Sequence, residues 1–224
     1  MTSRTFPPLL AAPLFALLAG CYDNVLWDYR DDPYLAEMAR GGVEEALRNA
    51  NSVYIDTRQI ALRTLAEASG RARKAGKTAA ADRLADAVIR RYQVEKDPSV
   101  RACVVLLCAP AIGRGSTPMV VFLRARIASG EFAGYAAISL AHLAPRNAYR
   151  DIVPLTRHPS PGVRLQAATA LAVLGDPKGR DAAVRVLWSM REPEWPAEVA
   201  GQPLPQAADS LRLRIERVFG PLSN

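Results

Sequence analysis

Two cysteines and two histidines in the body of the chain are the side chains that could bind a metal ion or act as nucleophile and base. Cys103 and Cys108 lie five residues apart, so on one α-helix they point in different directions, lie beyond disulfide reach and are expected to be small core residues. His142 and His158 each lie near an expected helix end, where a solvated or capping role is usual. Their spacing does not match a zinc site, and the chain has neither a phosphate-cradling glycine loop nor a Gly-x-Ser-x-Gly elbow. We therefore predict no catalytic residue, no metal site and no cofactor, and we expect that the protein is not an enzyme.

A third cysteine, Cys21, follows a segment typical of exported proteins. The run from Phe6 to Gly20 is uncharged and is preceded by one charged side chain, Arg4. A positive first segment, a short apolar segment and small residues before a break are the parts of a secretory signal peptide. The run has 15 residues and contains three prolines, whereas a membrane-spanning helix needs about 20 apolar residues. The sequence therefore favours a cleaved signal peptide over a transmembrane helix.

The last residues of this segment, Leu18, Ala19, Gly20 and Cys21, resemble the lipobox of bacterial lipoprotein signal peptides. The resemblance implies that Cys21 carries diacylglycerol, that the chain is cleaved after Gly20 and that the new amino group is acylated. Several acyl chains on one residue anchor a protein stably, where a single chain binds only marginally. Tyr22 stands where an aspartate retains some lipoproteins in the inner membrane, which favours the periplasmic face of the outer membrane. The alternative is an ordinary signal peptide followed by a free cysteine.

Basic residues are concentrated in the middle of the chain. The formal net charge is +7, and residues 97–191 carry 12 Lys and Arg against 5 Asp and Glu. For an exported protein, the polyanions that such a region meets are anionic lipids, glycans or acidic proteins rather than nucleic acid. The alternative is a solvated helical surface that is rich in arginine. The candidates for a basic binding surface are Arg124, Arg126, Arg146, Arg150 and Arg185.

Four segments of the chain align with one another and predict the helices that position these side chains. They begin at Thr57, Val100, Phe132 and Val163, which are 43, 32 and 31 residues apart. Positions one, five and nine of each segment share one stripe of a helix, because steps of four residues return near the same face. The sequence predicts further helices between these segments, one before them, and capping side chains ahead of a proline at Asp97, Ser160 and Asp176.

The stretches DPSVRACVVLLCAP and HPSPGVRLQAATALAVLGDP resemble the second helix of bacterial HEAT repeats. The similarity covers residues 79–190 well and 33–70 loosely, whereas the fixed Trp, Gly and Tyr positions of tetratricopeptide repeats, the alternative, are absent. The resemblance implies an all-α fold, a right-handed α-solenoid of stacked helix pairs with an extended concave face. In HEAT repeats an arginine at the second position commonly bridges to an acidic or carbonyl partner in the neighbouring turn. This implies a structural role, with ligand contact as the alternative, for Arg58, Arg101 and Arg164.

These observations predict one helical domain behind an anchored tether. The expected divisions are a signal peptide (1–20), a lipidated tether (21–32), a HEAT-like repeat domain (33–191), a Pro-rich connector (192–204) and a C-terminal capping helix (205–224). We expect a lipoprotein of the cell envelope that contacts the membrane through Cys21 and acts as a non-enzymatic scaffold for a protein partner. The alternative function is direct electrostatic binding of anionic lipid or glycan by the basic middle region, and we expect no nucleic-acid partner.

Overall fold

The structure, a computed structural model, describes residues 42–143 and 146–222. The predicted signal peptide, Cys21, the tether and the start of the first expected helix lie outside the described residues. Within them the one regular element besides the helices is a two-stranded antiparallel hairpin, which confirms the all-α prediction. None of the helices in this part of the chain combines the length and the apolar composition that crossing a membrane requires.

The order of the elements alternates long helices with short turns. In chain order they are α3 (Gly42–Asn49), α4 (Ile55–Lys74), α5 (Thr78–Val94), α6 (Pro98–Cys103), the π-helix η3 (Val104–Cys108), α7 (Ala109–Ile112), α8 (Thr117–Ser129), α9 (Ala133–Leu143), α10 (Ala148–Ile152), the 3-10 helix η4 (Val153–Arg157), α11 (Pro161–Leu174), α12 (Pro177–Ser189), β1 (Glu198–Val199), β2 (Gln202–Pro203) and α13 (Leu204–Phe219).

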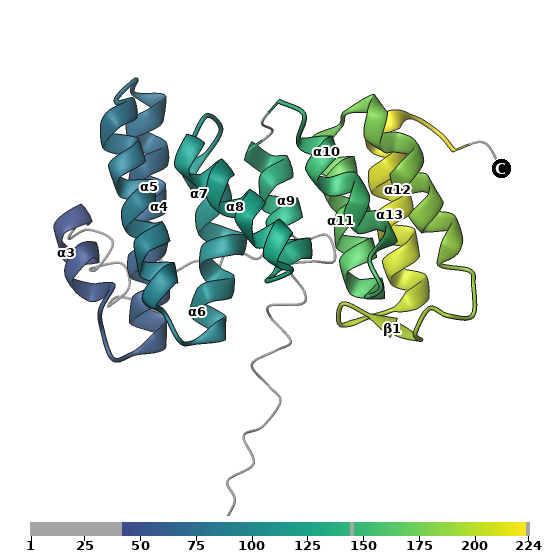
Figure 1. Cartoon of the computed structure of the whole chain (residues 1–224), viewed down its shortest axis with the longest axis horizontal. Helices are drawn as coiled ribbons and strands as arrows, with labels where there is room; N and C mark the ends of the chain where they lie inside the picture. The colour runs from purple at the N-terminus through teal and green to yellow at the C-terminus, as the bar shows by residue number, and fades with distance from the viewer. Residues whose placement is uncertain (1–41, 144–145, 223–224) are drawn as a thin grey trace, which may run out of the picture.

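The helices lie side by side in a row that runs from α3 at one end of the molecule to α12 and α13 at the other (Figure 1). In one layer, α4, α7, α9, α11 and α13 pack successively against one another. In the other layer α5 packs against α8, and η4 packs against α12. Contacts of α4 with α5, α8 with α9 and α11 with α12 join the two layers. Helices that are close in sequence are therefore neighbours in space.

The core of this row is built from the aligned segments. Their fifth, ninth and tenth positions are buried in every segment: Ala61, Leu65 and Ala66; Val104, Cys108 and Ala109; Ala136, Leu140 and Ala141; Ala167, Leu171 and Ala172. The first position is buried at Thr57 and Val100, but Phe132 and Val163 are half-buried. Phe132 has a positive φ of 54° and precedes α9, so it does not lie on the helical stripe.

All three predicted helix starts are correct, because α6, α11 and α12 begin at Pro98, Pro161 and Pro177, but the side chain caps the helix in two of the three. The Asp97 carboxylate accepts hydrogen bonds from the backbone N–H groups of Ser99 and Val100, and Asp176 accepts one from Lys178. The side chain of Ser160 makes no capping hydrogen bond at the start of α11, so that part of the prediction is wrong. Ser160 is exposed, and its backbone N–H donates to a neighbouring imidazole instead.

The second aligned segment departs from a regular α-helix. It widens into the π-helix η3, in which hydrogen bonds span five residues and side chains five apart return to nearly the same side. Cys103 and Cys108 are both buried free cysteines, as expected for small core residues, but the wider turn brings their thiols close enough to interact, so the prediction that they point apart is wrong. The hydrogen bond with Cys103, together with burial, raises the pKa of the Cys108 thiol well above its ordinary value. Pro110 gives the physical reason, because a proline inside an α-helix lacks an N–H and clashes with the preceding turn, which the wider π turn relieves.

The C-terminal segment covers the last helices of the row. The Pro-rich connector contains the β1–β2 hairpin, and the helix expected from residue 205 begins at Leu204. Leu211 and Ile215 are buried on the predicted stripe of α13. Val218 was expected on the same stripe but is 45% exposed, because it lies in the last turn, against Gly175 at the edge of the core.

Candidate functional site

Two of the three arginines at the second position of the aligned segments, Arg58 and Arg164, tie their helix to the turn that leads into it. Arg58 Nη1 donates to the backbone carbonyls of Ser52 (2.9 Å) and Val53 (3.1 Å), which precede it by six and five residues. Arg164 Nη1 donates to two carbonyls at the same separations, at 3.2 and 3.3 Å. The repeat in sequence is thus accompanied by a repeat in hydrogen bonding.

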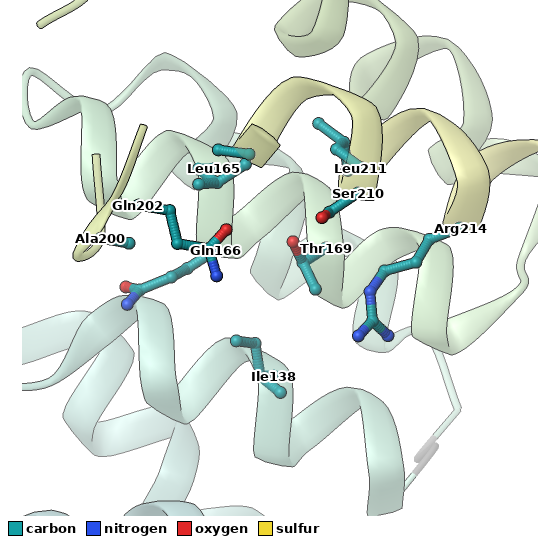
Figure 2. A pocket seen from close by; sticks show the side chains of 10 residues that line it. Ile138, Leu165, Gln166, Thr169, Ala200, Gln202, Ser210, Leu211 and Arg214 are labelled. Carbon is teal, nitrogen blue, oxygen red and sulfur yellow. The ribbon is translucent and has the colours of Figure 1, made fainter. Parts of the chain in front are cut away.

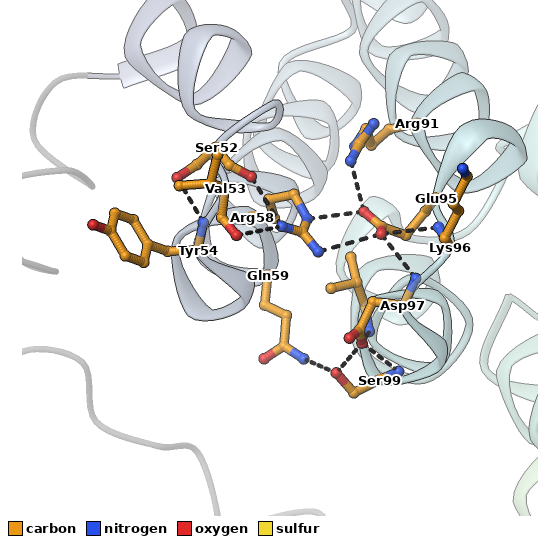
Figure 3. Close-up of polar contacts among 11 residues, drawn as sticks. Ser52, Val53, Tyr54, Arg58, Gln59, Arg91, Glu95, Lys96, Asp97 and Ser99 are labelled. Atoms are coloured by element: carbon orange, nitrogen blue, oxygen red, sulfur yellow. Dashed lines mark hydrogen bonds and ion pairs between the residues drawn. The ribbon is translucent and has the colours of Figure 1, made fainter. Parts of the chain in front are cut away.

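Glu95, which is 7% exposed, is the centre of a buried ion-pair network (Figure 3). Its carboxylate accepts hydrogen bonds from Arg58 Nε (2.9 Å) and Arg91 Nη2 (2.7 Å). The backbone N–H groups of Lys96 and Asp97 donate to the same carboxylate at 3.0 Å. Burial raises the pKa of Glu95, but the Asp97 backbone and the two arginines outweigh it and hold the pKa below its ordinary value. The network joins α4 to the turn that follows α5.

Glu131 has the corresponding place in the turn between α8 and α9. It forms ion pairs with Arg101 (Nη2 to Oε1, 2.5 Å) and with Arg126. Both guanidinium groups lie over the ring of Tyr92, at 4.5 and 5.5 Å from its centroid, and Tyr92 packs edge-on against Phe122 at 4.8 Å. A cation over an aromatic face is stabilised electrostatically. Arg126, a candidate for the basic surface, therefore lies in a network that links neighbouring helices.

The last aligned segment uses an aromatic partner in place of a carboxylate. Arg164 lies over the ring of Trp195 at 4.6 Å, and Trp195 is 5% exposed. The third segment has Ala133 where the others have arginine. There α9 and α11 approach closely instead, because a Cβ on Gly134 would come within 1.8 Å of Gln166 Oε1. Each repeat arginine thus contacts the connection into the following repeat, and the segment without one has a close helix contact.

The arginines predicted to form a basic surface have different surroundings. Arg124 forms an ion pair with Asp151 at 2.9 Å, and Arg126 pairs with Glu131. Within the described part of the chain, no carboxylate pairs with the remaining exposed candidates, Arg146, Arg150 and Arg185. Carboxylates therefore neutralise two of the five candidates.

The two histidines lie at helix ends and in different environments. His158 Nδ1 accepts a hydrogen bond from the backbone N–H of Ser160 at 3.1 Å. His142 lies in the last turn of α9, where burial, followed by the charges of Arg214 and Arg114, lowers its pKa. Among residues 42–143 and 146–222, no group of three or more His, Cys, Asp or Glu side chains could hold a metal ion.

We expect the free energy of unfolding to decrease as the pH falls below about 6.5, the ordinary pKa of histidine. Because the pKa of His142 is lowered in the folded protein, the unfolded chain takes up this proton first, and stability is lost as the pH falls from the unfolded pKa towards the folded pKa. Denaturant unfolding between about pH 7.5 and pH 5 checks this. His142→Gln should lose the slope and His158→Gln should keep it. An unchanged slope in His142→Gln would contradict the prediction.

A cleft lies between α9, α11 and α13, next to the hairpin (Figure 2). Its floor is apolar and its rim carries amide, hydroxyl and guanidinium groups. The lining residues are Ile138, Leu165, Gln166, Thr169, Ala200, Gln202, Ala207, Ser210, Leu211 and Arg214. The cleft has about 390 Å³ of free space, which includes open solvent, and about 20 Å³ is available to the centres of water-sized molecules, roughly the room that one water molecule needs.

No pattern in the sequence predicts this cleft. Its polar groups come from α11, the hairpin and α13, and no motif or fixed spacing connects them. The one available signal was Gln202, a polar residue in a connector that must pack on the last helices. In comparisons with known proteins, no family model, no curated protein and no solved structure matches this chain.

Proposed function

We propose that this protein is a lipoprotein that is anchored through Cys21 and that binds another protein with its helical domain, without catalysis. The observation that carries the proposal is the row of helix pairs (Figure 1). A row of this kind supports a right-handed HEAT-like α-solenoid, in which each repeat contacts its neighbours and the surface is long and continuous. Such a surface suits an extended protein partner.

The anchoring part of the proposal rests on the sequence from Leu18 to Cys21 and on the uncharged run before it. An acylated Cys21 would hold the helical domain at the membrane surface, and residues 22–32 would act as the tether. Export places the domain in the cell envelope, and Tyr22 favours the outer membrane. The partner would then be another protein of the envelope.

Replacing Cys21 by serine tests this proposal directly. We expect the wild-type protein, expressed in a bacterial host, to lose residues 1–20, gain the mass of acyl chains and sediment with membranes. Cys21→Ser should do none of these, because serine provides no thiol for acylation. Cys103→Ser is the matched control and should behave as wild type. If intact mass and membrane fractionation show an uncleaved, unacylated wild type, the anchoring proposal is wrong.

Direct electrostatic binding of anionic lipid or glycan is the second candidate function. It has less support, because Arg124 and Arg126 already face carboxylates. It would depend on the exposed arginines without such a partner, Arg146, Arg150 and Arg185. Binding of this kind should weaken steeply as salt is added, since exposed charges are screened. A protein–protein complex that survives about 0.5 M salt would favour the first candidate.

A further inference from the structure

We propose that the cleft between α9, α11 and α13 binds a carboxylate of an acidic peptide segment in the partner protein, with Arg214 as its charged ligand. The inference rests on the proposed protein-binding function and names the chemistry of that contact. Three features of the cleft support it: the charge at the rim, a buried donor without an acceptor, and the small size.

Arg214 brings an unneutralised positive charge to the rim. No carboxylate among the described residues forms an ion pair with it. Arg114 lies near the same end of α9, since both arginines act on the titration of His142. A guanidinium group can bind a carboxylate through two parallel hydrogen bonds, and this two-point contact is stronger than a single hydrogen bond. The rim therefore has the charge that an acidic group needs.

Gln202 supplies a second, independent observation. Its side chain is 8% exposed, and its Nε2 atom is buried with no hydrogen-bond partner in the described part of the chain. Figure 2 shows Gln202, Thr169 and Ser210 around the same opening, with both hydroxyl groups at the rim. A buried donor that lacks an acceptor costs free energy, which an incoming carboxylate or carbonyl oxygen would recover. The cleft therefore has neutral donors as well as a cation.

The size and floor of the cleft favour the end of an acidic side chain over a free small molecule. Because only about 20 Å³ is available to the centres of water-sized molecules, the cleft is too small for a sugar ring or a nucleotide base. The open part continues over the surface, so the rest of the ligand would lie outside. The floor of Ile138, Leu165 and Leu211 suits the methylene groups that precede a glutamate carboxylate. One guanidinium among amides and hydroxyls fits a single carboxylate better than a phosphate, for which proteins gather several cations or backbone N–H groups.

The first experiment is a titration of the full chain, solubilised in a nonionic detergent, with an amidated tetraglutamate peptide. The chain has two histidines, so proton NMR resolves both imidazoles. We expect the peptide to raise the pKa of His142, because a bound carboxylate offsets the charge of Arg214, and to leave His158 unaffected. Arg214→Glu should weaken binding by about tenfold or more. Arg217→Glu, an exposed arginine on the same helix, should change it by less than about twofold.

Three results of this titration would overturn the inference. They are no effect of the peptide on His142, equal binding by Arg214→Glu, and tighter binding of inorganic phosphate than of tetraglutamate. Arg214→Gln, which removes the charge without reversing it, repeats the test if the Glu variant fails to fold, as circular dichroism would show. Gln202→Leu should also weaken binding, because it removes the buried donor.

A second experiment separates this inference from the proposed function. A photo-crosslinking amino acid is placed in living cells at Leu213, beside Arg214 and 63% exposed, or at Val121 on α8, which is 61% exposed. Capture of one protein at position 213, lost in Arg214→Glu, agrees with the cleft. Capture at position 121 alone would contradict the cleft but leave the protein-binding function intact. Capture at neither position would contradict the protein-binding function itself.

Discussion

Replacing Glu95 by glutamine is expected to lower the free energy of unfolding by about 3–5 kcal/mol, the usual loss when one partner of a buried ion pair is removed. Glutamine has nearly the same shape, so the loss comes from the charge rather than from packing. Arg58 and Arg91 would keep their positive charges, with side chains 10% and 20% exposed, and would lack a carboxylate. Urea or guanidinium unfolding of the two proteins measures the difference.

Glu45→Gln is the matched control, because Glu45 also pairs with an arginine, Arg48, at 2.5 Å. That pair is exposed and lies within one helix, so solvent screens it and its loss should have a far smaller effect. Acid should act on Glu95 as the glutamine does. The pKa of Glu95 is lowered in the folded protein. Its contribution to the free energy of unfolding is therefore complete above the ordinary pKa of glutamate and is lost as the pH falls through the folded pKa. Equal effects of the two substitutions would show that Glu95 is not the centre of the network.

The helices of the aligned segments were predictable because apolar residues recur about every four positions in the sequence, and this spacing places them on one buried face of a helix. Ala61 and Leu65 lie one turn apart on the apolar face of their helix, and both are buried in the core. The π-helix was not predictable from this signal, since nearly every residue of VVLLC is apolar and no polar residue marks the register. Pro110 was the available warning, because a proline within an apolar helical run requires a local change of backbone geometry.

The contacts of the repeat arginines were only half predictable. Each arginine is the second residue of its segment, so Arg58 lies in the first turn of its helix, and this position determines which backbone carbonyls its guanidinium reaches. Their partners across the repeat are set by tertiary packing, as with Glu95, which is 37 residues away from Arg58. One partner is an aromatic ring, Trp195, which no charge pattern indicates. Gln202 and Arg214 come together for the same reason, by the packing of the hairpin and α13 on α11.

Replacing Gly70 by alanine is expected to lower the free energy of unfolding by about 2–3 kcal/mol, as overpacking of a tight interior contact does. A Cβ at this position would lie 2.3 Å from the backbone oxygen of Ala111 and 3.4 Å from its carbonyl carbon. Alanine is the better helix former, and by that effect alone it would add about 1 kcal/mol. The clash outweighs this gain because the obstructing atoms belong to the backbone of α7 and not to a movable side chain.

Gly162→Ala is the control that separates the clash from helix propensity. Gly162 lies in the first turn of α11, and the nearest atom to an added Cβ is Ser160 Oγ at 3.8 Å, so alanine should be neutral or raise stability by up to about 1 kcal/mol. Guanidinium unfolding should therefore show a lower midpoint for Gly70→Ala and an unchanged or higher midpoint for Gly162→Ala. Gly70 lies in the same helix as Arg58, and that helix must approach α7 closely while its other end binds Glu95. If Gly70→Ala is as stable as wild type, α4 can shift away from α7. The close approach of these two helices would then not depend on the absence of a side chain at position 70.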